Sequence, residues 1–237
     1  NANLSGAILI KADLGGVDLN GANLSGANLY DANLTGTNLN GANLSGADLS
    51  AVSLASANLS GANLEKTNLN SARVELTRPY DPSLDGPIEL PKQLRTVAIC
   101  AANLSGANFS GADLEGTNFV YCPMRSRSTI FSNANFSGAN LRKTSFYLDG
   151  IYPSPVDVSN VNFSGADLSY ANFTDANLEN ANFTGANLYK AILNNANLTN
   201  ANLSGANLTS TRLKNTNLES AILCNTTMSW GVVNDDC

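Results

Sequence analysis

The chain has 237 residues, a formal net charge of −6 and no histidine. Because histidine is the commonest general base and metal ligand, this composition disfavours catalysis and metal chemistry. The mild acidity argues against a nucleic-acid binder, which needs basic patches, and no apolar run approaches the ~20 residues of a membrane-spanning helix.

Residues 1–74 are predicted to form a first block built from a five-residue unit. Each unit has a small residue, then Asn or Asp, then Leu, then two positions rich in Gly, Ser, Asn and Asp; we call the Leu the centre. Centres recur from Leu4 to Leu69 and Val74 without a slip. The small residue and the centre share one side of an extended strand, whereas a helix needs apolar spacings of three and four. The last two positions favour turns.

Such a unit cannot bury its own apolar pair and must stack on copies of itself, which predicts a solenoid. The block begins inside a repeat and lacks an initiator Met, so we expect upstream residues to have been removed. A first coil without a cap would expose its core and its sheet edges. We therefore expect either missing N-terminal residues or an end-to-end homodimer.

Residues 75–97 interrupt the repeat and hold four of the seven prolines. The distance from Val74 to Ile99 is a multiple of five, so the frame is preserved, as a degenerate coil would preserve it. Against that interpretation, the frame would place Pro79 and Glu89 at centres. We therefore expect a protruding loop, because loops of this length are uncommon without a role. Its candidate interaction residues are Arg78, Tyr80, Asp81, Asp85, Lys92 and Arg95.

A second block, residues 98–146, continues the repeat with centres from Ile99 to Phe119 and a weaker match at Met124. The frame then slips by two residues near 125–129 and resumes at Phe131. Residues 147–157 depart from the repeat again and are predicted to form a bulge.

The third block, residues 158–223, repeats without a slip. Its most regular units are Ala166-Asp167-Leu168-Ser169-Tyr170, Ala171-Asn172-Phe173-Thr174-Asp175, Ala176-Asn177-Leu178-Glu179-Asn180 and Ala181-Asn182-Phe183-Thr184-Gly185. These units resemble the pentapeptide-repeat family, whose motif is A-(D/N)-L-x-x, and the resemblance covers most of the chain.

The resemblance implies an all-β fold: a right-handed, quadrilateral parallel β-helix with four units and twenty residues per coil. Centres and small residues point inward and the other three positions outward. About 40 centres then give about ten coils and a rod ~50 Å long at ~4.8 Å per coil. Outward Asn residues form hydrogen-bonded ladders along the stack, and Phe163 and Phe183, twenty residues apart, pack together inside.

The tail, residues 224–237, leaves the repeat and contains the single Trp. A solenoid needs a terminal cap, and Trp230, Val232 and Val233 are suited to cover the last apolar layer. Cys224 and Cys237 bracket this segment and are predicted to form a disulfide, worth ~3 kcal/mol for a loop this short. Family members with a similar Cys-Asn-Thr-Thr-Met tail resemble exported cyanobacterial or plastid-lumen proteins.

The other two cysteines are Cys100 and Cys122, which are separated in the sequence by little more than one coil. Neighbouring coils would bring them within bonding distance, and an even cysteine count with plausible pairing suggests an oxidising compartment. The alternative is two unrelated thiols, with one buried as a small apolar residue.

No catalytic, cofactor-binding or metal-binding motif is present. There is no nucleophile elbow, no phosphate-binding glycine loop and no Cys-x-x-Cys spacing, and we expect no cofactor. Asp167, Asp175 and Glu179 form the nearest acidic group, which we interpret as solvated surface. The most concentrated basic group is Arg125, Arg127, Arg142 and Lys143; it is either ordinary surface beside a loop or a contact for an acidic partner.

We therefore predict a single solenoid over 1–237 that is not an enzyme. It is a structural or protein-interaction scaffold in an exported compartment, the periplasm or the thylakoid lumen, with loops on a rigid frame as its recognition elements. The partner is an unidentified protein, not nucleic acid, and the chain does not insert into a membrane. The alternative is a DNA-mimicking gyrase binder, but 19 acids and 13 bases fall short of the roughly 30 charges that ~50 Å of DNA would require. Ice binding is a third alternative, weakened by scattered threonines.

Overall fold

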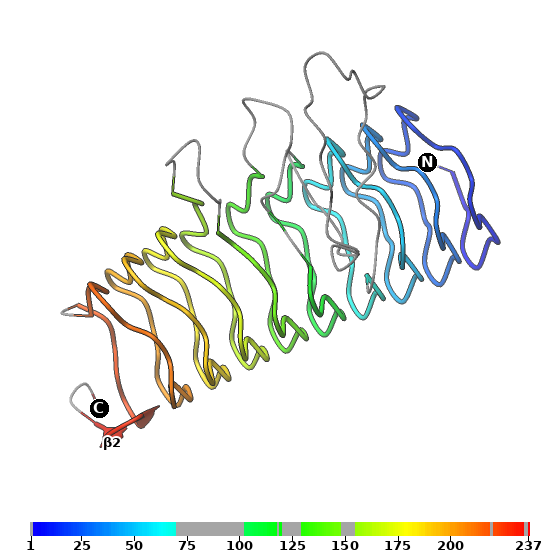
Figure 1. The fold of residues 1–237 in the computed structure, drawn as a ribbon. Coiled ribbons are helices and arrows are strands. Elements are labelled where there is room, and N and C mark those ends of the chain that lie inside the picture. The colour runs from blue at the N-terminus through cyan, green and yellow to red at the C-terminus, as the bar shows by residue number, and fades with distance from the viewer. Residues whose placement is uncertain are drawn as a thin grey trace, which may run out of the picture.

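The computed structural model describes residues 2–69, 102–117, 119, 129–147, 155–218, 220–234 and 237. These residues wind into a rod of stacked coils, with the two ends of the chain at opposite ends of the rod (Figure 1). Within the described ranges there is no helix, and the two strands are β1 (Thr226–Met228) and β2 (Gly231–Val233). The coils are instead held together by isolated parallel bridges.

The bridges divide each coil into four sides. Bridge residues in one coil are five apart, and each pairs with the residue one coil further on, so that Asn3 pairs with Asn23 and Ile8 with Asn28. Four bridge positions per twenty residues confirm the quadrilateral coil. We name the four columns of bridge residues ladders A to D. Ladder A runs from Asn3 to Ile222 and ladder B from Ile8 to Thr227; ladder C runs from Asp13 to Ser53 and from Ser145 to Arg212; ladder D runs from Asp18 to Ile130 and from Asp157 to Asn217.

The regular units that the structure describes form their hydrogen bonds in the same way. The Leu4 N–H donates to the Asn23 carbonyl at 2.7 Å, and the Asn23 N–H donates to the Ala2 carbonyl at 2.9 Å. The Ala7 N–H then donates to the Leu4 carbonyl at 3.0 Å and closes a β-turn. Gly6, the third residue of this turn, has a φ of 64°, which is the left-handed conformation that a type II turn requires. The predicted strand-and-bend unit is therefore confirmed.

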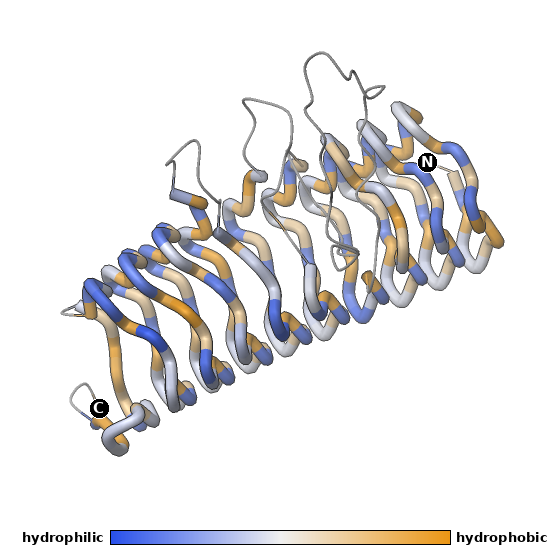
Figure 2. Tube along the Cα trace, viewed as in Figure 1, coloured by the Kyte–Doolittle hydropathy of each residue, from blue (hydrophilic) through white to orange (hydrophobic). Residues whose placement is uncertain are grey.

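The core is a continuous apolar shaft. Centres such as Leu24 and Leu168 and small residues such as Ala42 and Ala166 are fully buried. Hydrophobic and hydrophilic positions alternate along the described parts of the coils (Figure 2), as the repeat predicts. The inward and outward assignments made from the sequence are thus confirmed for the described coils.

Phenylalanine fills the middle of this shaft in two columns. Phe109, Phe136, Phe163 and Phe183 stack beside ladder A with ring centroids 4.8, 5.5 and 5.1 Å apart. Phe119, Phe146 and Phe173 stack beside ladder C at 4.8 and 4.6 Å. Rings of the two columns also meet edge to face, as Phe146 and Phe163 do at 5.9 Å. The predicted contact between Phe163 and Phe183 is therefore confirmed.

The C-terminal segment differs from the expected cap. Strands β1 and β2 pair as an antiparallel hairpin, and a disulfide joins Cys224 to Cys237, the pair expected from the sequence. Met228 is buried and Val233 packs against the core, but Trp230 and Val232 are 72% and 60% exposed. The prediction that these two residues cover the last apolar layer is wrong, because Trp230 lies in the turn between the strands and Val232 points outward.

Candidate functional site

Extra residues enter the solenoid in three consecutive coils. Along ladder A, neighbouring residues are 20 apart up to Asn63, then 45 apart from Asn63 to Asn108, and 27 apart in each of the next two steps, to Asn135 and to Asn162. After Asn162 the regular spacing of 20 returns. The first of the three coils is therefore more than twice as long as a regular coil, and each of the other two carries a seven-residue insertion.

The bridges also show where in each coil these residues enter. In the third of these coils, Ser145 lies on ladder C and Asp157, the next bridge residue, lies on ladder D. In the second, Phe119 donates its N–H to Ser145 on ladder C, and the following bridge residue, Ile130, lies on ladder D. Both insertions thus join ladder C to ladder D, a turn that we call corner CD. In the first, the extra residues lie between Leu69, beside ladder B, and Ala102, which precedes ladder D.

The seven-residue insertions correct the sequence interpretation. The sequence frame indicates a slip of two residues near 125–129, whereas the coil there gains seven. Because the frame repeats every five residues, a slip of two and an insertion of seven look the same in it. Only the pairing of residues between coils distinguishes an insertion of seven residues from a slip of two.

The predicted loop residues lie outside the described part of the chain. This holds for Arg78, Tyr80, Asp81, Asp85, Lys92 and Arg95, and for Cys100, Cys122, Arg125 and Arg127. The loop at 75–97 and the Cys100–Cys122 disulfide therefore stay predictions. Of the bulge at 147–157, the structure describes the two ends, Tyr147 and residues 155–157.

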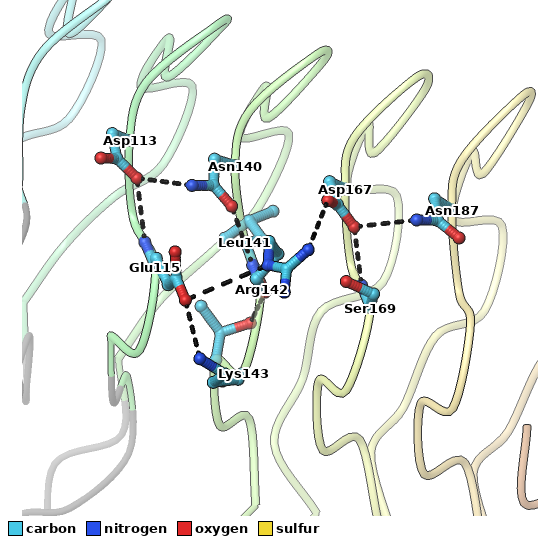
Figure 3. A network of polar contacts seen from close by, with 10 residues as sticks. Asp113, Glu115, Asn140, Leu141, Arg142, Lys143, Asp167, Ser169 and Asn187 are labelled. Atoms are coloured by element: carbon cyan, nitrogen blue, oxygen red, sulfur yellow. Dashed lines mark hydrogen bonds and ion pairs between the residues drawn. The ribbon is translucent and has the colours of Figure 1, made fainter.

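A polar network joins four coils on ladder B and on the turn that follows it, corner BC (Figure 3). Lys143 Nζ lies 3.0 Å from Glu115 Oε1, and Arg142 lies between Glu115 at 4.0 Å and Asp167 at 3.7 Å. Asn187 Nδ2 donates to Asp167 Oδ1 at 3.1 Å. The basic pair Arg142 and Lys143 is therefore engaged with carboxylates of neighbouring coils.

The hydrogen bond from Lys143 lowers the pKa of Glu115 below its ordinary value. Partial burial of the carboxyl group raises this pKa, whereas the charges of Lys143 and Arg142 lower it further. Glu115 thus stays ionised at neutral pH. The network links coils electrostatically across the region of the insertions.

The match to a protein-family model identifies the family of this chain. A scan against protein families matches the pentapeptide-repeat model in eight copies, over residues 1–36, 27–70, 99–125, 127–147, 159–195 and 191–229, which is well over half of the chain. The chain belongs to the pentapeptide-repeat family.

Solved structures of pentapeptide-repeat proteins are similar to this chain. HetL, involved in heterocyst differentiation regulation in the cyanobacterium Nostoc sp. strain PCC 7120, is 27% identical; the alignment covers 98% of this chain and 91% of HetL, with a TM-score of 0.35. A pentapeptide repeat protein from the Arabidopsis thaliana thylakoid lumen is 28% identical over 53% of this chain and 66% of that chain, with a TM-score of 0.28.

QnrB1, a plasmid-mediated fluoroquinolone resistance protein, is 14% identical over 96% of this chain and 89% of QnrB1, with a TM-score of 0.40. No curated protein matches the sequence.

The pentapeptide-repeat coil also separates acidic residues that are close together in the sequence. Asp167 lies on ladder B, Asp175 follows ladder C at corner CD, and Glu179 follows ladder D. The prediction that these three residues form one acidic group is therefore wrong, because each step of five residues along the chain moves to the next of the four sides of the coil.

Conversely, the coil brings together residues that the sequence analysis missed. Tyr170 and Tyr189 meet edge to face with ring centroids 5.8 Å apart. Lys190 Nζ lies 5.5 Å from the Tyr170 ring centroid and 5.1 Å from that of Tyr189. A hydrogen bond with Tyr189 raises the pKa of Lys190. Their signal in the sequence is the spacing of twenty between Tyr170 and Lys190, which becomes visible once units are counted by coil.

Proposed function

We propose that this pentapeptide-repeat protein is a non-enzymatic scaffold for protein interaction in an exported compartment, and that it recognises its partner at corner CD. It is a right-handed β-solenoid of about ten coils. Its recognition elements are the two seven-residue insertions at corner CD and the longer insertion between ladders B and D of the coil before them. The main element is the segment 75–97 in that longer insertion, with Arg78, Tyr80, Asp81, Asp85, Lys92 and Arg95.

The observation that carries this proposal is the position of the extra residues. A regular coil closes with twenty residues, and each added residue increases the entropy cost of closing its connection. Two seven-residue insertions nevertheless enter at corner CD in successive coils, and the coil before them is extended by more than a full coil's length between ladders B and D. Loops on a rigid frame are where binding residues usually lie. The described residues that flank these three insertions lie on neighbouring coils.

The disulfide supports an exported location. Cys224 and Cys237 are bonded in the structure, and structural disulfides persist in oxidising compartments and are rare in the cytosol. Within the part of the chain that the structure describes, no helix is long and apolar enough to cross a membrane. The periplasm and the thylakoid lumen are the compartments that we propose.

The alternative, a DNA-mimicking gyrase binder, has less support. On ladder B the carboxylates Asp48, Asp113 and Asp167 alternate with asparagines. They occur on every second coil, ~10 Å apart at ~4.8 Å per coil, whereas duplex DNA carries one charge per ~1.7 Å. A gyrase supercoiling assay tests this alternative directly: inhibition or protection of gyrase would favour it over a scaffold.

The scaffold is tested by capture of partners with the intact chain and with two shortened chains. Deleting residues 75–99 restores the twenty-residue spacing between Asn58 and Asn103, and deleting 148–154 does the same between Asn135 and Asn162. We expect the first deletion to abolish capture of a partner that the intact chain retains, with the coils still folded by circular dichroism. Equal capture by the intact chain and by both shortened chains would contradict the proposal.

A further inference from the structure

Beyond the insertions, one face of the solenoid combines an exposed and a half-buried tyrosine with exposed cations. Tyr170, 43% exposed, and Lys190 occupy corner BC in neighbouring coils, and Tyr189 precedes Lys190. Arg212 on ladder C is the bridge partner of Ile192, two residues beyond Lys190. Lys214 follows at corner CD of the same coil as Arg212. We call Tyr170, Tyr189, Lys190, Arg212 and Lys214 the tyrosine–lysine face.

Tyr170 occupies a backbone position that suits other residues better. Its φ is 62°, in the left-handed region, where a bulky side chain is an outlier. In the rest of the described chain, the residues with a left-handed backbone are Gly, Asn, Asp, Ser, Ala or Lys, and none of them is aromatic. Neither the turn nor the core requires a tyrosine here. Strained residues held by their surroundings cluster at binding sites.

The cations of this face have no carboxylate partner among the described residues, although Lys190 also contacts the two tyrosine rings. In the described part of the chain, Lys190, Arg212 and Lys214 make no ion pair, unlike Arg142 and Lys143. The one described carboxylate among them is Asp175, which accepts a hydrogen bond from Asn195 Nδ2 at 2.8 Å. Three cations against one carboxylate make the face locally positive, although the chain as a whole carries −6.

We propose that the tyrosine–lysine face binds an acidic, extended segment of a partner protein. Carboxylates of the segment pair with the cations on two adjacent coils, which are ~4.8 Å apart, and an apolar side chain packs on the edge-to-face tyrosines. The negative charge of the whole chain repels a long polyanion such as nucleic acid, whereas a short acidic segment meets the local positive field. This surface is separate from corner CD of the earlier coils.

The probe is a fluorescein-labelled peptide of the repeat Glu-Phe-Glu-Gly, with a Gln-Phe-Gln-Gly peptide as the control ligand, followed by fluorescence anisotropy on the full chain. We expect the acidic peptide to bind and the neutral peptide to bind at least about tenfold more weakly, with binding that weakens as salt is added. Lys190→Glu combined with Arg212→Glu should weaken binding by at least about tenfold. The matched control is Lys66→Glu, an exposed lysine whose φ of 55° is close to the 57° of Lys190; it should leave binding unchanged.

The variant Tyr170→Asn tests whether Tyr170 serves peptide binding or the stability of the fold. Because Asn tolerates the left-handed conformation, this variant should keep a Tm at or above that of the parent while losing affinity for the acidic peptide. A lowered Tm with unchanged affinity would show a structural role and overturn the proposal. So would equal binding of both peptides, or binding of single-stranded DNA or anionic vesicles without binding of the acidic peptide. The chain that lacks 75–99 should bind the peptide normally, so a failure of the corner CD proposal leaves this one intact.

Discussion

Asn108 donates a hydrogen bond from Nδ2 to Asn63 Oδ1 at 3.4 Å, although 45 residues separate the two in the sequence. The same bond links Asn63 to Asn43, only 20 residues away, at 3.2 Å. Ladder A therefore continues unchanged past the largest insertion. The side-chain amides hold neighbouring coils in register regardless of the length of chain between them.

Asn63 is a test of how much this ladder contributes. Its Oδ1 accepts the Asn108 amide and the Glu65 N–H at 3.1 Å, and its Nδ2 donates to Asn43. Asn63→Ala should lower the free energy of unfolding by about 1–3 kcal/mol, measured by urea denaturation.

Asn40→Ala is the control for this ladder. The Asn40 N–H donates to Asn38 Oδ1 and its carbonyl accepts from the Gly21 N–H, and neither bond needs the Asn40 side chain. This variant should change stability by less than about 0.5 kcal/mol. Equal effects of the two substitutions would mean that the ladder contributes nothing specific.

The phenylalanine columns predict a gradient of stability along the rod. Phe163 stacks on Phe136 and Phe183 and meets Phe146 and Phe173 edge to face, whereas Phe183 contacts two rings at the end of the column. Leu occupies the centres of later coils on the same ladder, so both Leu variants should fold. Phe163→Leu should cost about 1–3 kcal/mol and Phe183→Leu about half of that. Thermal unfolding compares them, and a larger loss for Phe183→Leu would contradict the gradient.

The left-handed turn position predicts opposite changes in stability for two substitutions, one that removes a glycine and one that introduces it. Gly26 has a φ of 64° and open space where a β-carbon would lie, so Gly26→Ala introduces backbone strain alone and should destabilise by about 1–2 kcal/mol. Ala51 already bears that strain at 60°. Ala51→Gly should therefore stabilise, by less than about 1 kcal/mol, because glycine also gains entropy in the unfolded chain. Chemical denaturation of the two variants beside the parent measures both shifts, and the same sign for both would refute this account of the turn.

Glu115 predicts an acid-dependent contribution to stability. Its pKa is lower in the folded chain than in the unfolded chain, chiefly through the hydrogen bond from Lys143. The stabilisation is therefore complete above the unfolded pKa and is lost as pH falls through the folded pKa. Because the pair is partly exposed, Glu115→Gln should cost under about 1 kcal/mol at pH 7. Denaturation at descending pH should bring parent and variant together as the pH falls through the folded pKa of Glu115; a constant difference would exclude the ion pair as the cause.

The sequence predicts the repeated part of the fold well, because each quintet carries its own evidence. The alternation of small residue and centre identifies the buried side, as at Ala166 and Leu168. The Asn before each centre identifies the ladders, and the distance of twenty between Phe163 and Phe183 identifies their stacking. These are local rules, and each coil repeats them.

What the sequence does not supply is the angular position of each residue around the rod. Asp175 and Glu179 are close in sequence and lie on different sides, whereas Tyr170 and Lys190 are distant and lie together. An insertion changes this relation for every later residue, and the five-residue frame does not record its full length, because an insertion of seven and a slip of two look the same in it. The prediction for Trp230 is wrong for a different reason: its apolar character suggests a cap, but the two-residue turn between β1 and β2 places it in solvent.

Because corner CD accepts additional residues in the chain, the solenoid has a practical use. A coil there accommodates seven more residues while the asparagines of ladder A stay hydrogen-bonded from coil to coil. Foreign segments grafted between ladders C and D of chosen coils would stand at heights fixed in steps of ~4.8 Å. The molecule would then serve as a molecular ruler on which the spacing of two displayed peptides is set by counting turns.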